Sequence, residues 1–288
     1  MESTVSGCTE RGAPNVVFVH GWPDGPDSAW RPVLNLLEPT HRCVTVTLPG
    51  YDGADLGLTG HSFERLGALL AGTIRRECGE GGANLLVHDW GSHVGFQCEE
   101  QFPELVQKMV VLDVGPPQFG GRKRNWKLLP GMLAMGFAYQ YWLILALLIS
   151  RVPIVGPLVG DLLARTVAWL TRWGSGLTGA DRAVPPGITA ASSYPYLNFQ
   201  ARFFRDLLHG APAVALPRRP LATTPNCAVL FAYGAAKGFA FHAGTWERAV
   251  RARTDGSAVQ AWDDCEHWLQ LQHPERVAAA ASAFFATS

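Results

Sequence analysis

Short apolar runs and amphipathic stretches alternate along the first and last parts of the chain. Apolar and β-branched runs that end at Gly, Pro or Asp are typical of strands buried on both faces of a parallel sheet. Such runs lie at residues 15–20, 42–47, 85–87, 108–114, 226–233 and 258–262. Segments expected to form helices lie at residues 29–37, 62–78 and 274–285. The pattern predicts an α/β fold with a mostly parallel central sheet and helices on both faces.

The alternation stops near residue 115 and resumes near residue 223. The residues between are apolar and aromatic and are interrupted by Pro and Gly. We therefore expect three segments, 1–115, 116–222 and 223–288, of which the middle one is an insertion between the two parts of one α/β domain.

A charge-free stretch within this insertion, residues 132–150, is long enough to span a bilayer at a rise of ~1.5 Å per residue. Gly136, Gln140 and two tyrosines interrupt the stretch, and Arg151 ends it. We expect a buried helix here. A helix on the membrane surface is the first alternative, and a true membrane span is the weaker one. Because the buried helix is preferred, membrane association is not expected.

Composition excludes several other classes of protein. The chain has 288 residues, 48% of them hydrophobic, and 24 basic side chains balance 24 acidic ones. That balance argues against a nucleic-acid partner. The six cysteines are scattered without metal-ligand spacing, so we expect free structural thiols, no metal and no cofactor. The N-terminus shows no signal peptide, so a cytoplasmic location is expected. No feature of the sequence specifies an oligomeric state.

The chemistry of the chain centres on Asp89. The apolar run at 85–87 is followed by Asp89 and by the small residues Gly91, Ser92 and Gly95, which is the pattern of a strand turning sharply into a helix. A carboxylate presented at such a turn is ionised at neutral pH and can attack an alkyl carbon without a base to activate it. The alternative reading is an ordinary helix N-cap.

Four motifs occur in a familiar order. They are H-G-W-P-D at 20–24, V-H-D-W-G at 87–91, H-W at 267–268 and P-E-R-V at 274–277. Together they resemble the α/β-hydrolase superfamily, and within it the epoxide hydrolase family, whose Asp nucleophile is shared with haloalkane dehalogenases. The resemblance implies the α/β-hydrolase fold with an inserted α-helical cap, and a sheet shortened at its N-terminal edge because so few residues precede the first predicted strand.

The resemblance also implies roles for individual residues. Asp89 would be the nucleophile and His267 the base that activates water, while the backbone N–H groups of Trp22 and Trp90 would form the oxyanion hole. His20, Tyr51 and Trp268 would contact substrate. His88, beside the nucleophile, is expected to be scaffold.

The carboxylate that should orient His267 is not where many members of the family carry it. Gly238 occupies that place. Asp113 ends the strand predicted after the nucleophile, so its side chain should reach the same sheet edge as Asp89. We expect Asp113 to replace the missing acid, with Asp263 or Asp264 as alternatives.

Two tyrosines of the predicted cap match the family's ring-opening acids. Tyr139 is followed by Gln, and Tyr196 stands in a Tyr-x-Asn pattern. A phenol with a pKa of about 10 remains protonated at neutral pH and can donate to a departing epoxide oxygen. Tyr141 and Tyr194 are the alternatives for this role.

The sequence thus predicts an epoxide hydrolase acting on a small apolar epoxide and water. A haloalkane dehalogenase is one alternative, although Trp22 stands where those enzymes commonly carry a halide-binding Asn. A catalytically inactive binding protein for an apolar ligand is the other, because Gly238 replaces the usual acid.

Overall fold

The computed structural model describes residues 1–116, 139–208, 225–237 and 240–287. Across these residues a seven-stranded sheet has the order β1-β3-β2-β4-β5-β6-β7, with β1 antiparallel to β3 and all other neighbours parallel. The strands are β1 (Glu2–Gly7), β2 (Asn15–Val19), β3 (Arg42–Thr47), β4 (Ala83–His88), β5 (Val106–Leu112), β6 (Ala228–Gly234) and β7 (Ala258–Trp262). The predicted parallel sheet is confirmed. A single strand, β1, precedes β2 along the chain.

Helices cover both faces of this sheet, because successive strand residues point to opposite sides. Val16 and Phe18 of β2 pack in the core beneath α1 (Pro26–Leu37), α9 (Leu269–Gln272) and α10 (Pro274–Ala286). Val17 and Val19 belong to the opposite core. The helices over that face are α2 (Phe63–Cys78), α3 (Trp90–Gln101) and α8 (Gly244–Arg251), and the 3-10 helix η1 (Pro103–Leu105) leads into β5. Each fully buried Val, Leu or Phe of these cores contributes about 1.5–3 kcal/mol.

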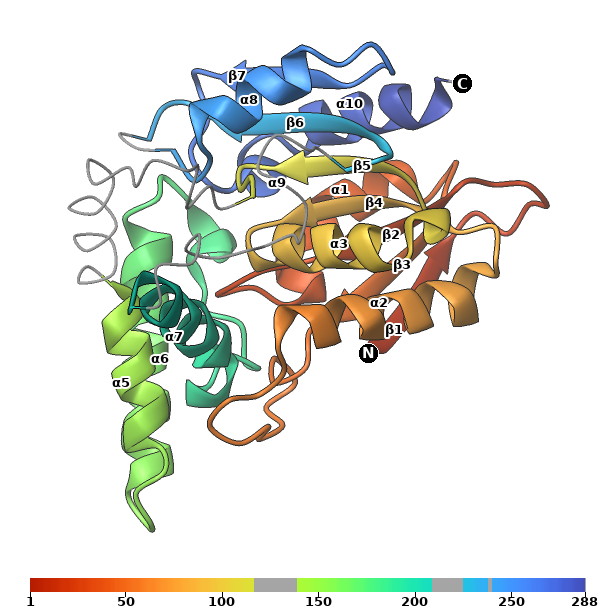
Figure 1. The fold of residues 1–288 in the computed structure, drawn as a ribbon. Helices are drawn as coiled ribbons and strands as arrows, with labels where there is room; N and C mark the ends of the chain where they lie inside the picture. The colour runs from red at the N-terminus through yellow and green to blue at the C-terminus, as the bar shows by residue number, and fades with distance from the viewer. Residues whose placement is uncertain (117–138, 209–224, 238–239, 288) are drawn as a thin grey trace.

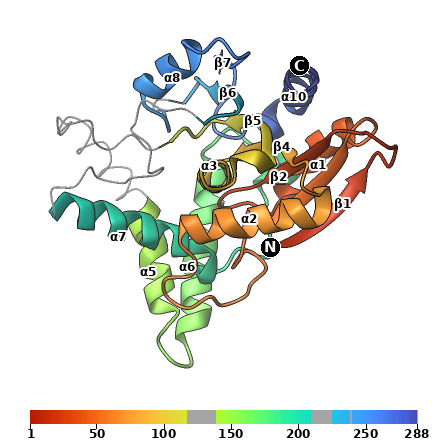
Figure 2. The same ribbon diagram turned by 45° about the vertical axis from the view of Figure 1, so that its right-hand side comes forward.

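A group of helices lies between β5 and β6 in the chain. It comprises α5 (Tyr141–Ile149), α6 (Gly156–Trp173), the 3-10 helices η3 (Gly179–Arg182) and η4 (Ala190–Ser193), and α7 (Tyr194–Leu208). We call residues 139–208 the helical insertion. Figures 1 and 2 show it beyond the carboxyl ends of the parallel strands. The boundary expected at residue 222 lies outside the described residues.

A buried ion pair joins the helical insertion to the sheet domain. Arg172 of α6 donates to Asp24, which follows β2, and both side chains are fully buried. The indole N–H of Trp268 donates to the other oxygen of Asp24, at 2.9 Å. Breaking such a pair leaves an uncompensated buried charge, so it ties α6 firmly to the ends of two core segments.

Helix α5 is only partly buried. Leu143, Ala146 and Leu147 lie in the core, whereas Trp142 and Leu148 are about half exposed. The expectation of a buried helix is therefore wrong for one of its faces. No helix among the described residues is long and apolar enough to cross a membrane. Residues 132–138 of the charge-free stretch lie outside the described residues.

Candidate active site

The nucleophile candidate Asp89 stands at a strained turn between β4 and α3. Its backbone has φ 54° and ψ −124°, a conformation that residues with a side chain rarely adopt. Two glycines make the turn possible. A Cβ on Gly91 would lie 2.1 Å from the carbonyl oxygen of Val19, and one on Gly21 would lie 2.2 Å from Oδ1 of Asp89. The end of β2 and the turn after β4 therefore meet at backbone contact distance.

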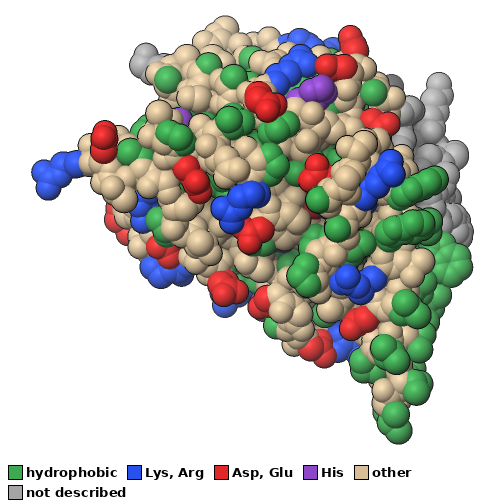
Figure 3. All heavy atoms as spheres, turned by 180° about the vertical axis from the view of Figure 1, so that it is seen from behind, with side chains coloured by type: hydrophobic (Ala, Val, Ile, Leu, Met, Phe, Trp, Pro, Cys, Tyr) green, Lys and Arg blue, Asp and Glu red, His purple; other side chains and the backbone are tan. Residues whose placement is uncertain are grey.

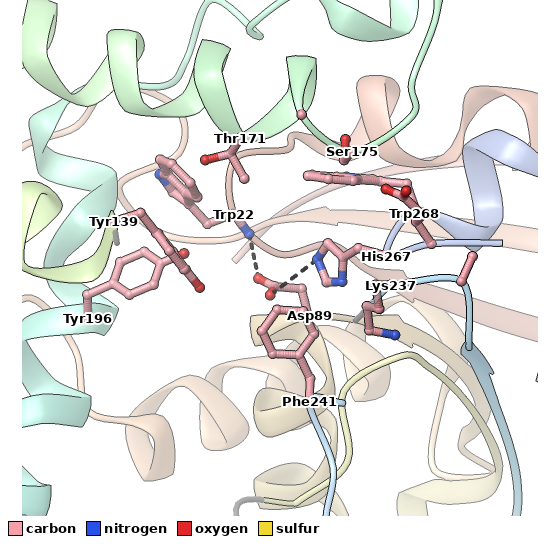
Figure 4. A pocket seen from close by; sticks show the side chains of 13 residues that line it. Trp22, Asp89, Tyr139, Thr171, Ser175, Tyr196, Lys237, Phe241, His267 and Trp268 are labelled. Atoms are coloured by element: carbon pink, nitrogen blue, oxygen red, sulfur yellow. Dashed lines mark hydrogen bonds and ion pairs between the residues drawn. The ribbon is translucent and has the colours of Figure 1, made fainter. Parts of the chain in front are cut away.

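The two oxygens of Asp89 have different surroundings. Oδ1 accepts a hydrogen bond from the backbone N–H of Trp22 at 2.8 Å, while Oδ2 lies 3.7 Å from Nε2 of His267 (Figure 4). Burial raises the pKa of Asp89 above its ordinary value; the charge of His267 and the backbone N–H groups of Trp22 and Trp90 act in the opposite direction. Both predicted oxyanion-hole donors thus point at this carboxylate.

His267 follows β7 in the chain and is hydrogen-bonded to Asp113, which follows β5. Nδ1 of the imidazole lies 2.6 Å from Oδ2 of Asp113. Burial disfavours the charged imidazole, but the hydrogen bond and charge of Asp113 and the charge of Asp89 raise the pKa of His267 above its ordinary value. The alternative acid Asp264 instead bonds the exposed Arg276 and the ring of His273. Of the two, Asp113 is the acid that reaches His267.

Lys237, in the loop after β6, completes the surroundings of Asp113. Its ammonium group donates to Oδ1 of Asp113, and the backbone N–H of Gly234 donates to the same oxygen at 3.1 Å. Burial opposes ionisation of Asp113, but His267 and Lys237 together hold its pKa below the ordinary value. None of the sequence motifs points to this lysine. Its place directly beside Gly238, where the family's usual acid is absent, was the available signal.

His88 packs directly against His267. Its Nε2 lies 3.0 Å from the carbonyl oxygen of His267 and its Nδ1 lies 3.1 Å from Nε2 of Gln270. Burial lowers the pKa of His88 to about 3, so the ring is neutral and can donate from one nitrogen and accept at the other. This placement fits the scaffold role expected for it.

A cavity of about 350 Å³ opens beside these groups. Its lining residues come from the ends of β2, β4, β6 and β7 and from the helical insertion: Trp22, Asp89, Tyr139, Thr171, Gly174, Ser175, Tyr196, Ala236, Lys237, Phe241, Glu266, His267 and Trp268. A volume of this size suits a small organic molecule.

Tyr139 and Tyr196 of the helical insertion face Asp89 across the cavity. Their ring centroids are 5.6 Å apart, and Figure 4 shows both hydroxyl groups directed toward the carboxylate. Burial raises the pKa of Tyr139 to about 12 and that of Tyr196 well above its ordinary value, so both phenols remain protonated at neutral pH. The alternatives Tyr141 and Tyr194 do not line the cavity. The ring of Tyr194 packs against Gly50 and Gly60 instead.

The three residues expected to contact substrate lie in different places. Trp268 lines the cavity. His20 does not line it, because its ring is buried between backbone groups: Nδ1 lies 3.0 Å from the carbonyl of Gly21 and Nε2 accepts from the N–H of Leu48 at 3.2 Å. Tyr51 borders a neighbouring hollow near Asp24 and Arg172.

Metal ligands and disulfides are not found in the described part of the chain. No three His, Cys, Asp or Glu side chains there are arranged to hold a metal ion, and all six cysteines are free.

The family model of alpha/beta hydrolases matches residues 16–280 of this chain. The chain belongs to the alpha/beta hydrolase family. By sequence it is a hydrolase of that family. The observed strand order and the sharp turn at Asp89 between β4 and α3 agree with the match. "Epoxide hydrolase 1" of Caenorhabditis elegans is 31% identical over 106 residues, which are 36% of this chain and 26% of the relative. The chain thus matches only about a quarter of the length of that relative.

Solved hydrolase structures share the fold over almost the whole chain. An epoxide hydrolase from Bacillus megaterium is 20% identical, with a TM-score of 0.69 over 99% of this chain and 96% of that one. A haloalkane dehalogenase loop variant from Bradyrhizobium elkanii is 19% identical, with a TM-score of 0.66 over 98% and 92% of the two chains. At these identities the likeness establishes the fold of this alpha/beta hydrolase.

Proposed function

We propose that this alpha/beta hydrolase is an epoxide hydrolase that opens small apolar epoxides to vicinal diols. The observation that carries the proposal is the position of the Asp89 carboxylate. It lies between two backbone N–H donors on one side and His267 on the other, and two protonated tyrosines face it across the cavity. The partial sequence match to a curated epoxide hydrolase supports this activity.

In the first step Asp89 forms an ester. Oδ2 attacks a carbon of the epoxide ring, the bond from that carbon to the ring oxygen breaks, and its electron pair stays on the oxygen. Tyr139 or Tyr196 donates a proton to this oxygen, and the tyrosinate takes a proton back from water. The product is a hydroxyalkyl ester of Asp89.

In the second step water cleaves the ester. His267 removes a proton from water, and the oxygen attacks Cγ of Asp89. The negative charge that develops on Oδ1 is stabilised by the N–H groups of Trp22 and Trp90. The alkyl oxygen then leaves with the proton from His267, which frees the diol and leaves Asp89 as a carboxylic acid. This acid ionises, and its proton neutralises the hydroxide formed when water returned a proton to the tyrosinate, so the carboxylate is restored. Asp113 stabilises the imidazolium during this step.

The two steps predict different behaviour for two variants. Purified protein should convert styrene-type or fatty-acid epoxides to diols, and Asp89→Ala should form neither diol nor adduct. His267→Gln should retain ring opening and lose ester hydrolysis by at least 1000-fold, so intact mass spectrometry should detect protein plus one epoxide. Absence of both diol and adduct with every epoxide would end the proposal.

Dehalogenation of haloalkanes is the second candidate. Trp22 lines the cavity, and its buried indole N–H has no acceptor within the described residues, so it could donate to a halide ion. The tyrosine pair favours the epoxide instead, because halide is a good leaving group and needs no acid. Bromide release from bromoalkanes, measured beside diol formation, distinguishes the two. The 2.6 Å contact of Asp113 with His267 supports a working enzyme over a binding protein.

A further inference from the structure

The outer face of the α5–α6 hairpin, residues 141–173, is almost entirely apolar. Every exposed residue of the hairpin except Thr166 is apolar. Of the large hydrophobic side chains exposed anywhere in the described residues, all but Val5, Leu36, Leu58 and Phe204 belong to it. They are Trp142, Leu145, Leu148, Val152, Ile154, Val155, Leu158, Val159, Leu162, Trp169, Leu170 and Trp173. Figure 3 shows this apolar face running to the end of the hairpin. A contiguous apolar surface of this extent marks an interaction site.

The charged side chains of the hairpin are directed toward the protein. Arg151 pairs with Asp55 at 2.6 Å, and Arg172 pairs with the buried Asp24. Asp161 accepts from the backbone N–H of Ala190 at 2.8 Å.

Arg165, the remaining charged residue, donates to the carbonyl oxygens of Pro185 and Ile188 at 3.0 and 3.2 Å. A helix that faces water places its charges outward and its apolar residues inward. The hairpin differs from this pattern. Its charged side chains bind groups on the inner side, which faces the protein, and its outer side carries no charged side chain of its own. The partner of this surface must therefore be apolar and uncharged.

The dimensions of the surface match one leaflet of a bilayer. Its tip is the turn at Val152, Ile154 and Leu158, of which Ile154 is 95% exposed. Figures 1 and 2 both show this turn projecting away from the body of the molecule. Leu158 and Trp169 lie about three turns apart along α6, about 16 Å at ~1.5 Å per residue. Half of a hydrocarbon core is about 15 Å, and tryptophan concentrates at the boundary between hydrocarbon and water.

We propose that the hairpin inserts its apolar tip into one leaflet of a membrane and does not cross it. Trp142 and Trp169, each half exposed, would lie at the level of the lipid headgroups. Lipid is preferred over a second copy of the chain because the apolar face runs to the end of a projecting tip, where Ile154 is 95% exposed, and fluid hydrocarbon can cover such a tip without a matching surface. Every charged side chain of the hairpin is bound by a partner, and the exposed pair of Arg151 with Asp55 is neutral overall, which favours hydrocarbon contact over attraction to anionic lipid.

Docking in this orientation would place the membrane boundary close to the cavity. Thr171, which lines the cavity, lies on the same turn of α6 as Trp169 and Trp173. If the proposed function holds, an epoxide dissolved in the bilayer would have a short path to Asp89. This consequence rests on the proposed function, whereas the membrane contact does not.

Flotation of the full chain with phosphatidylcholine vesicles tests the contact. The protein should float with these uncharged vesicles equally at low and high salt. Ile154→Glu and Leu158→Glu should each weaken partitioning by about 100-fold, because a charge within the hydrocarbon is costly. Leu36→Glu, on an exposed site of α1, is the matched control and should float like the unaltered protein. Both tip variants should retain turnover of a water-soluble epoxide.

Two results would overturn the proposal. One is that the unaltered protein stays with the unbound fraction. The other is that it elutes as a dimer that Ile154→Glu converts to a monomer, which would assign the surface to a second copy. Flotation needs no turnover, so Asp89→Ala should float as well as the unaltered protein even if no epoxide is a substrate.

Discussion

Asp113 shows how much a single buried residue of this site depends on its partners. It is fully buried, and one of its oxygens faces the imidazole of His267 while the other accepts from Lys237 and from a backbone N–H. A carboxylate in such a place would become neutral without these donors. Lys237 thereby acts as a positioning residue: together with His267 and the Gly234 N–H, which remain when Lys237 is replaced, it favours the ionised form of Asp113 that orients His267.

Replacing Lys237 by Met should change the pH dependence of catalysis. The charge of Lys237 lowers the pKa of Asp113 and also that of His267, so its loss should raise both. His267 must be neutral to accept a proton from water. The acid limb of the kcat profile should therefore move to higher pH, and kcat at pH 7 should fall about tenfold. Lys237→Arg, which keeps the charge, should move the acid limb less than Lys237→Met does. If the acid limb of Lys237→Met stays where it is in the unaltered protein, this role of Lys237 is contradicted.

At the scale of elements, the site depends on how the helical insertion is fixed to the sheet. Tyr139 and Tyr196 can face Asp89 only if α6 and its neighbours keep their position over the strand ends. The buried contact of Arg172 with Asp24 lies at this junction, and the Arg172 guanidinium also lies 5.7 Å from the ring of Trp268. The helical insertion, which supplies five of the thirteen residues that line the cavity, is thus held in place beside His267.

Arg172→Met should lower the free energy of unfolding by about 3–5 kcal/mol, because it leaves Asp24 buried and unpaired. Equilibrium urea unfolding measures this loss. Asp24→Leu combined with Arg172→Met should recover part of it, since neither charge then remains unpaired. Arg31→Met removes an exposed pair with Asp27 and should change stability by less than about 1 kcal/mol. Equal losses of unfolding free energy in Arg172→Met and Arg31→Met would contradict the structural importance of the buried pair.

At the scale of the whole molecule, the helical insertion and the sheet share one apolar core. Leu143, Leu147 and Val167 of the insertion belong to the same buried cluster as Val17 and Val87 of the central strands. A boundary between two independent domains would instead cross few buried contacts. The cavity lies within this shared structure, so its two sides should not separate before the molecule unfolds.

Thermal or urea unfolding should accordingly show one transition. Far-UV circular dichroism, which reports helices, and tryptophan fluorescence, to which all ten tryptophans contribute, should give the same midpoint. The trapped ester of His267→Gln should raise that midpoint for both signals together. Two separate midpoints would show that the insertion unfolds on its own.

Much of the fold was predictable because the spacing of apolar residues along short segments indicates which of them form strands and which form helices. The strands at 42–47 and 258–262 and the helix that begins after Ser62 agree with the apolar patterns, and Ser62 accepts from the N–H of Arg65 as a cap should. The turn at Asp89 was predictable for the same reason, since small residues and a strand end are visible in a dozen positions. The catalytic roles of the site residues stay predictions.

By itself the sequence determined the kinds of elements, their order and the candidate groups of the site, because these depend on neighbours along the chain. Only the tertiary structure decided that Asp113 meets His267 across 154 residues and that Lys237 braces it. It also decided that Arg172 turns inward while the outer face of α5 and α6 is left apolar and exposed. Hydropathy reports that a helix is apolar; which side is covered depends on what packs against it, and distant parts of the chain supply that packing.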